Sequence, residues 1–188
     1  IKRVSDQLAQ MRGAAMKIGQ LMSMDSGDVL PPELSQILVR LRDNAHPMPP
    51  AQLKRVLNAE WPAQWLQSFH KFDVSPIAAA SIGQVHRAQL KDGRDLAIKV
   101  QYPGVAKSID SDVANVGVLM RMSGLLPKGF ELAAYLEEGR KQLHEETNYT
   151  REATQLVRFG DLLADRTQFV VPEMHGDWST PNILAMTY

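Results

Sequence analysis

The 188-residue sequence contains no cysteine, which excludes a disulfide framework, a thiolate metal site and a thiol nucleophile. Its 21 basic and 21 acidic side chains balance, so no net field attracts the chain to nucleic acid or to an anionic lipid surface. No run approaches the roughly 20 apolar residues of a membrane span, and the first residues show no signal peptide. We therefore expect no transmembrane segment in this chain, no nucleic-acid partner and no secretion.

Hydrophobic residues make up 44% of the chain, and in its first 60 residues they recur at helical spacing. The first predicted helix ends at Ser26-Gly27, and a second begins at Pro31-Pro32. A loop over 44–50 precedes a third helix. The apolar positions of the three helices are Val4, Leu8, Met11, Ala15, Ile18 and Met22, then Leu34, Ile37, Leu38 and Leu41, and then Leu53, Val56 and Leu57.

Shorter apolar runs begin near Phe69 and indicate a sheet. Asp92-Gly93 is a strong hairpin signal. A helix capped by Asp110 or Ser111 is expected to reach about Leu126, and a long helix to span 132–163. The predicted strands cover 69–74, 85–90, 96–101, 169–172 and 183–187, with a small-residue loop over 77–83. This order predicts an α+β fold, with a helical N-terminal extension over 1–68 and a second domain over 69–188 that contains an insert helix at about 105–130.

A lysine interrupts the apolar strand Ala97-Ile98-Lys99, and a buried ammonium group must be paired. Protein kinases place Val-Ala-Ile-Lys on such a strand, where the lysine holds the α and β phosphates and pairs with a glutamate on a helix. Leu96 replaces the valine here. Taken alone, a lysine on an edge strand that reaches solvent is the simpler interpretation.

The loop before this hairpin favours a nucleotide site. Kinases cover the phosphates with a Gly-x-Gly-x-x-Gly-x-Val loop. The aligned segment keeps the third glycine and the valine, but alanines replace the first two glycines. Each added Cβ restricts the backbone and holds phosphates slightly farther away, so we expect a stiffer loop. A plain turn is the alternative interpretation of the segment Ala78-Ala79-Ala80-Ser81-Ile82-Gly83-Gln84-Val85.

Glu152 is the predicted partner of Lys99, because it lies on the long helix expected after the hairpin. Glu145 and Glu146 are expected about two turns earlier on the same helix. A glutamate-rich helix is more often a solvated helix, and the hairpin lysine favours a functional role for Glu152.

Together these motifs resemble the UbiB family of atypical kinase-like proteins, which is linked to ubiquinone (coenzyme Q) biosynthesis. The resemblance covers nearly the whole chain. It rests on three motifs, namely Lys17-Ile18-Gly19-Gln20, the alanine-rich loop continued to His86, and Lys99-Val100-Gln101-Tyr102-Pro103-Gly104-Val105.

The resemblance implies that 69–188 is the small (N-terminal) lobe of a kinase-like fold and that the second lobe is absent from this chain. Lys99 would bind the nucleotide phosphates and Glu152 would pair with it. Met186 would lie at the hinge near the adenine. The expected cofactor is ATP or ADP with Mg²⁺, whose ligands are expected mainly in the second lobe, so no metal-binding residue is predicted here. The predicted nucleotide-binding residues are Ala78, Ala79, Ala80, Ser81, Ile82, Gly83, Val85, Ala97, Lys99 and Met186.

A regulatory contact is also implied by the resemblance. Lys17 and Gln20 would fold back over the cleft and meet the family's Glu-x-Asp motif, which matches Glu146-Thr147-Asn148. Asn148 departs from the family aspartate, since it keeps an oxygen acceptor but loses the charge.

A second kinase-like motif spans 175–182, where His-x-Asp is followed five residues later by an asparagine. It follows Glu152 by only 23 residues (175 minus 152), too few for the hinge and helices that precede a kinase catalytic loop. We therefore interpret it as a connection between two short strands that lead to the hinge. Under the alternative, Asp177 and Asn182 would be catalytic.

The full-length protein is thus expected to be a kinase-like ATPase that supports ubiquinone biosynthesis, whereas this chain alone should be inactive. Its expected partners are an adenine nucleotide and ubiquinone-biosynthesis proteins or an isoprenoid lipid. The expected location is cytoplasmic, at the inner face of a bacterial membrane, or mitochondrial. One alternative is a pseudokinase scaffold or lipid-binding module without phosphoryl transfer, which the loop alanines and Asn148 favour. Another is a helical interaction module, which would have no need of Lys99.

Overall fold

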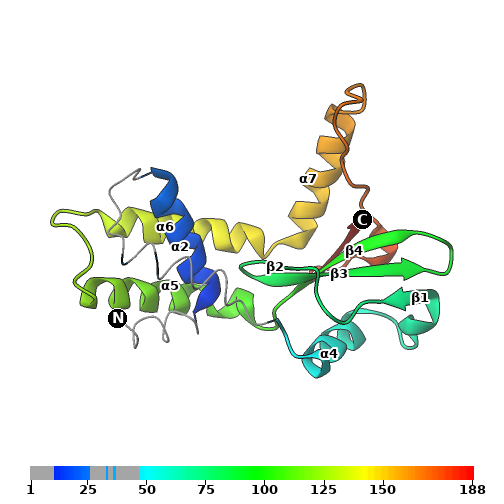
Figure 1. Ribbon diagram of the computed structural model, residues 1–188, viewed down its shortest axis with the longest axis horizontal. Coiled ribbons are helices and arrows are strands. Elements are labelled where there is room, and N and C mark those ends of the chain that lie inside the picture. Colours follow the sequence, from blue (N-terminus) through cyan, green and yellow to red (C-terminus); the bar gives the residue numbers. More distant parts are fainter. Residues whose placement is uncertain (1–10, 26–32, 34–35, 37–46) are drawn as a thin grey trace. The chain divides into compact units, whose positions relative to one another are not determined.

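The computed structural model describes residues 11–25, 33, 36 and 47–188 (Figure 1). The chain forms two compact units, each with its own internal packing. One consists of Ile1–His46 and Gly104–Glu145, and the other of Pro47–Pro103 and Glu146–Tyr188. The predicted apolar positions Val4 and Leu8, the helix end at Ser26-Gly27, and the apolar positions of the helix expected after Pro31-Pro32 lie outside the described residues.

The helical unit contains α2 (Arg12–Asp25), α5 (Val105–Met122) and most of α6 (Leu132–Glu146). The predicted apolar stripe is confirmed within α2, where Ala15, Ile18 and Met22 are buried. Gly139 of α6 lies close to Ile18 of α2. A Cβ on Gly139 would lie 2.9 Å from Cγ1 of Ile18, so a larger residue would not fit there. Small residues thus let α2 and α6 approach each other.

The insert helix begins earlier than its predicted cap. Gly104 adopts a φ of +79° and turns the chain out of the sheet, so α5 begins at Val105. Asp110 lies inside this helix and accepts a hydrogen bond from Nε2 of His144, at 3.0 Å. The expected helix start at Asp110 or Ser111 is therefore wrong, and the helix ends at Met122, short of Leu126.

The long helix predicted over 132–163 is two helices, α6 and α7 (Tyr149–Leu162). The side chain of Asn148 accepts a hydrogen bond from the backbone N–H of Arg151, at 2.9 Å, which is the geometry of an N-cap. A cap inside the periodic segment starts a new helix, so the prediction of one continuous helix is wrong. Glu145 and Glu146 belong to the helix before the one that carries Glu152.

The second unit is built on an antiparallel sheet with the strand order β1-β3-β4-β5, while β2 pairs with β3 (Figure 1). Gly93 adopts a φ of +97° and closes the predicted hairpin between β3 and β4. β2 lies within the predicted small-residue loop. The strands are β1 (Phe69–Phe72), β2 (Ala78–Ala79), β3 (Gly83–Leu90), β4 (Asp95–Gln101) and β5 (Ile183–Thr187).

The strand predicted over 169–172 does not form. Val170 is 93% exposed, and Pro172 has no backbone N–H to donate to a ladder. The chain meets the sheet two residues later, where Met174 forms a single bridge with Met186.

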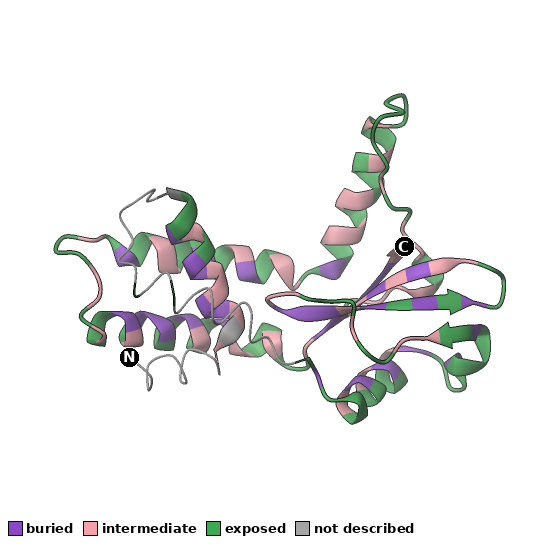
Figure 2. Ribbon diagram, in the orientation of Figure 1, coloured by how far each residue is buried: buried purple, intermediate pink, exposed green. Residues whose placement is uncertain are grey.

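One face of this sheet carries the core of the unit. Figure 2 shows buried residues along β3 and β4 and on α4 (Pro50–Glu60). Leu96, Ile98 and Val100 of β4 are buried on this face against the apolar side of α4. An aromatic cluster completes the layer, formed by Trp61, Trp65, Phe69, Phe72 and Trp178. Residues 47–68 therefore belong with the sheet, which differs from the division at residue 68 expected from the sequence.

Candidate functional site

The other face of the sheet carries Lys99, because side chains of a strand alternate between the two faces. β4 lies between β3 and β5, so the interpretation of Lys99 as an edge-strand lysine is wrong. Figure 1 shows α7 on this side of the sheet and α4 on the other.

Lys99 and Glu152 form an ion pair. Nζ of Lys99 lies 2.6 Å from Oε1 and 2.8 Å from Oε2 of Glu152. Glu152 lies in the first turn of α7, where the positive end of the helix dipole favours a carboxylate. The side chains are 18% and 38% exposed, so the pair is partly shielded but open to a ligand. The structure thus brings together the two residues predicted to act at the phosphates.

The ring of Tyr149 lies next to this ion pair. The Nζ atom of Lys99 lies 4.8 Å from the centroid of the tyrosine ring, which is cation–π geometry. Tyr149 is only 1% exposed, and burial, with the charges of Glu152 and Glu146, raises the pKa of its hydroxyl far above the usual value. The ring is therefore a neutral platform under the ammonium group.

The alanine-rich loop is a tight hairpin. Ala78 pairs with Val85 and Ala79 with Gln84, and the N–H of Ala80 donates to the carbonyl of Gly83 at 2.8 Å. Between these pairs, the hydroxyl of Ser81 donates to Oε2 of Glu146 at 2.8 Å. Hydrogen bonds thus hold this loop closed along its length.

Gly83 meets a packing requirement at the end of this loop. A Cβ at this position would lie 2.5 Å from the carbonyl oxygen of Val100 and 2.8 Å from the hydroxyl of Tyr149. The third glycine of the motif therefore allows the loop to rest on β4 and on Tyr149.

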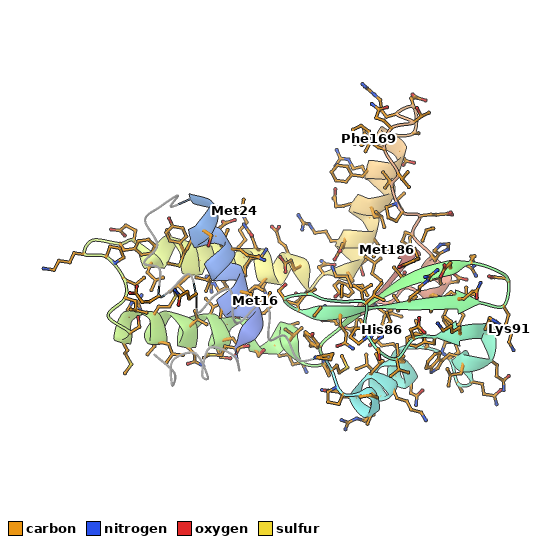
Figure 3. All side chains as sticks on the ribbon, viewed as in Figure 1. Met16, Met24, His86, Lys91, Phe169 and Met186 are labelled. Carbon is orange, nitrogen blue, oxygen red and sulfur yellow. The ribbon has the colours of Figure 1, made fainter. Side chains whose placement is uncertain are left out.

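Three neighbouring strands present the other predicted nucleotide-binding residues. Val85 pairs with Lys99, and Ala97 pairs with Met186, so all four occupy the same face of the sheet. Figure 3 shows Met186 on one side of the sheet and His86 on the other. The ring of His86 stacks on Phe72 of the aromatic cluster. Ile82 was also predicted to bind the nucleotide, but its side chain is buried and is not accessible to a ligand.

The predicted regulatory residues divide between the two units. Lys17, partly buried, and Gln20, exposed, lie on α2 in the helical unit, and their encounter with Glu146 stays a prediction. Glu146 ends α6 and holds Ser81, while Asn148 caps α7. An amide oxygen serves a cap as well as a carboxylate oxygen does, which gives Asn148 a structural role without a charge.

The polar side chains of the motif over 175–182 form hydrogen bonds with other residues of the sheet unit. Arg94 donates two hydrogen bonds to Asp177, at 3.1 and 2.7 Å, and lowers the pKa of that carboxyl. Asn182 and Thr180 instead donate to the carboxylate of Glu60. Asp177 and Asn182 thus hold the turn before β5 by separate contacts. Only the second of the two strands that this segment was expected to connect is formed.

A buried polar chain on the core face was not predicted. Oε1 of Gln84 accepts a hydrogen bond from the N–H of Met48 at 2.6 Å, and Nε2 of Gln84 lies 2.8 Å from Nε2 of His86. Nδ1 of His86 lies 2.9 Å from the carbonyl of Asp73, so this nitrogen donates and Nε2 accepts. Burial lowers the pKa of His86. The alternation of Gln84 and His86 in one strand was the available signal for this network.

Within the described part of the chain, no group of three or more His, Asp or Glu side chains is arranged to hold a metal ion. None of the described helices is both long enough and apolar enough to cross a bilayer.

An antiparallel sheet whose middle strand presents a lysine to a glutamate on the adjacent helix defines the small lobe of a kinase-like fold. Residues 40–188 match the ABC1 atypical kinase-like domain. The chain belongs to this family, which confirms the resemblance drawn from the sequence motifs.

Relatives of known name support this assignment. The chain is 46% identical over 187 residues to atypical kinase COQ8, mitochondrial, from Saccharomyces cerevisiae, covering 100% of this chain and 37% of the relative. It is 34% identical over 183 residues to the probable protein kinase UbiB of Erwinia tasmaniensis, covering 95% of this chain and 33% of the relative. This chain therefore spans about a third of the length of these two relatives.

A solved structure shares the fold. It is the complex of Rv3197 with erythromycin from Mycobacterium tuberculosis, which matches with a TM-score of 0.57 and 29% sequence identity. The match covers 94% of this chain and 43% of that chain.

Proposed function

We propose that this chain forms the nucleotide-binding small lobe of an atypical kinase-like ATPase, in which Lys99 binds the phosphates of ATP or ADP. The observation that carries the proposal is the Lys99–Glu152 ion pair on the same sheet face as Val85, Ala97 and Met186. Three apolar side chains beside one oriented cation suit a ligand with a flat base and a charged phosphate group. The alanine-rich loop ends next to this face at Gly83 and would cover the phosphates.

Mg²⁺ would accompany the nucleotide, but the described residues do not fit a metal site of their own. Magnesium takes oxygen ligands, mainly carboxylates and phosphates. The carboxylates near Lys99 are already engaged, Glu152 by Lys99 and Glu146 by Ser81. The metal ligands would therefore come from the part of the full-length protein outside this chain.

We extend the proposal to ubiquinone biosynthesis because the chain resembles the UbiB family and is related to COQ8 and UbiB. The full-length protein would act in mitochondria or at the inner face of a bacterial membrane. Its partners would be ubiquinone-biosynthesis proteins or an isoprenoid lipid.

The experiment that tests the nucleotide site is thermal unfolding of the full-length protein with Mg-ADP or Mg-ATP. A ligand at one hundred times its dissociation constant stabilises the native state by about 2.7 kcal/mol. We expect a rise in Tm that is lost in Lys99→Ala, since the phosphates lose their cation. Lys91→Ala is the matched control, because Lys91 is exposed in the hairpin turn and should keep the full rise. Equal shifts in the wild type and Lys99→Ala would contradict the proposal.

A pseudokinase scaffold is the second candidate, and the closed loop favours it. Ser81 is tied to Glu146, and alanines stand where kinases have flexible glycines. If Lys99→Ala restores ubiquinone synthesis in a deficient strain as well as the wild type does, the scaffold is favoured and phosphoryl transfer is not required.

A further inference from the structure

Tyr149 carries an unusual hydroxyl group. Among the residues that the structure describes, it is the one buried side-chain polar group without a hydrogen-bond partner. An unpaired buried hydroxyl destabilises the native state by roughly 1–3 kcal/mol, and phenylalanine would fill the same space without that cost. The tyrosine therefore keeps a hydroxyl group that destabilises the native state and that none of the described hydrogen bonds uses.

The groups around the Tyr149 hydroxyl indicate what it could bind. The ring of Tyr149 contacts the Lys99 ammonium group, and its hydroxyl lies against Gly83 at the end of the alanine-rich loop. Lys99 and the alanine-rich loop are the two features that would bind a nucleotide phosphate. The hydroxyl thus lies beside both, and it is neutral, so it keeps a proton to donate.

The end of the alanine-rich loop at Gly83 covers the hydroxyl, so a ligand reaches it only if this loop end moves. The loop is held over it by a two-residue strand pairing, by the Ala80–Gly83 hydrogen bond and by the Ser81–Glu146 hydrogen bond. The end of the loop is held as well, because the N–H of Tyr102 donates to the carbonyl of Ile82 at 2.9 Å and Gly83 pairs with Gln101 of β4. Gly83 would therefore have to shift against these contacts to open the space between the hydroxyl and Lys99. A phosphate oxygen bound by Lys99 could then accept a hydrogen bond from Tyr149.

We propose that Tyr149 is a nucleotide-binding residue whose hydroxyl donates a hydrogen bond to a phosphate oxygen when the loop moves at Gly83. This inference rests on the proposed function. Tyr149 would also act as a positioning residue, because its ring contacts the Lys99 ammonium group.

Tyr149→Phe tests the inference because it removes only the hydroxyl and keeps the ring under Lys99. We expect two effects of opposite sign in the full-length protein. Without ligand, Tm rises by about 2 °C, because the unpaired hydroxyl is gone. With Mg-ADP, affinity falls about tenfold, since a hydrogen bond to a charged oxygen is lost.

Calorimetric titration of wild type and variant with Mg-ADP and with adenosine measures the second effect. Adenosine has no phosphate, so its affinity should be the same in both proteins. Tyr135→Phe is the matched control, because that tyrosine stacks on Phe130 in the helical unit and should leave ADP affinity unchanged.

The outcomes separate the two proposals. Wild-type protein that binds no nucleotide contradicts the proposed function itself. Wild-type protein that binds Mg-ADP, with Tyr149→Phe binding equally well, overturns the role of the hydroxyl and leaves the site intact. An equal loss for ADP and adenosine also overturns it, because the phosphate would not be the group recognised.

Discussion

At the scale of single residues, the sheet unit separates two kinds of polar side chain onto two faces. On the α7 face, Lys99 and Glu152 are paired and partly exposed. On the core face, Gln84 and His86 are fully buried and satisfied by fixed hydrogen bonds. The first pair could be predicted because the kinase motif places a lysine on this strand and a glutamate partner on a helix. The second was missed because its partners, Met48 and Asp73, come from segments without a motif.

His86 makes stability depend on pH. Its folded-state pKa lies below the unfolded value of about 6.5, so the native state binds fewer protons than the unfolded state. The stabilisation is complete above pH 6.5 and decreases as the pH falls below it. The loss is at most about 1.4 kcal/mol per pH unit for one proton. Protonated Nε2 would face the amide group of Gln84, which is a donor–donor conflict.

Chemical denaturation at pH 7.5 and pH 5.5 measures this loss. His86→Gln should unfold more easily at pH 7.5 but lose less stability on acidification than the wild type does. His70→Gln is the control, since His70 is exposed on β1, and it should retain the wild-type loss. An acid loss unchanged in His86→Gln would show that another group is responsible.

At the scale of elements, the sequence predicted the hairpin better than the helices. β3 and β4 form as expected because Asp92-Gly93 fixes the turn and the alternating pattern fixes the faces. The break between α6 and α7 was missed because both helices share one apolar period. It depends on the Asn148 cap and on Gln101, which donates to the carbonyl of Thr147 at 2.9 Å. That hydrogen bond joins residues 46 positions apart, a separation that local periodicity does not report.

The cap should set the start of α7 and hence the position of Glu152. Asn148→Ala should destabilise this end of the helix by about 1 kcal/mol, because the N–H of Arg151 loses its acceptor. Asn148→Asp should preserve the cap. Amide hydrogen exchange at Arg151 measures the effect, with Thr150→Ala, an exposed neighbour, as the control. Equal protection of Arg151 in Asn148→Ala and the wild type would contradict the role of the cap.

At the scale of the whole molecule, each compact unit is assembled from two separate segments of the chain. The sheet unit joins α4 to the end of the chain, since Trp61 donates its indole N–H to the carbonyl of Trp178 at 3.1 Å, 117 residues away. A boundary drawn at residue 68 from the change in pattern could not anticipate this, because the amphipathic α4 resembles the helices that precede it. The units therefore follow from packing partners rather than from chain order.

The chemistry of these units predicts how residues 1–188 behave alone. Phosphoryl transfer needs a positioned metal ion and a residue that orients the nucleophile, in addition to a lysine at the phosphates. The described residues supply Lys99 and Glu152 but no cluster of acidic side chains for a metal. We therefore expect phosphate release from Mg-ATP by purified residues 1–188 to equal that of their Lys99→Ala variant, with the full-length protein assayed in parallel as the positive control. Turnover by residues 1–188 that disappears in Lys99→Ala would mean that this lobe holds the metal through residues outside its described part, and the division of labour proposed here would have to be abandoned.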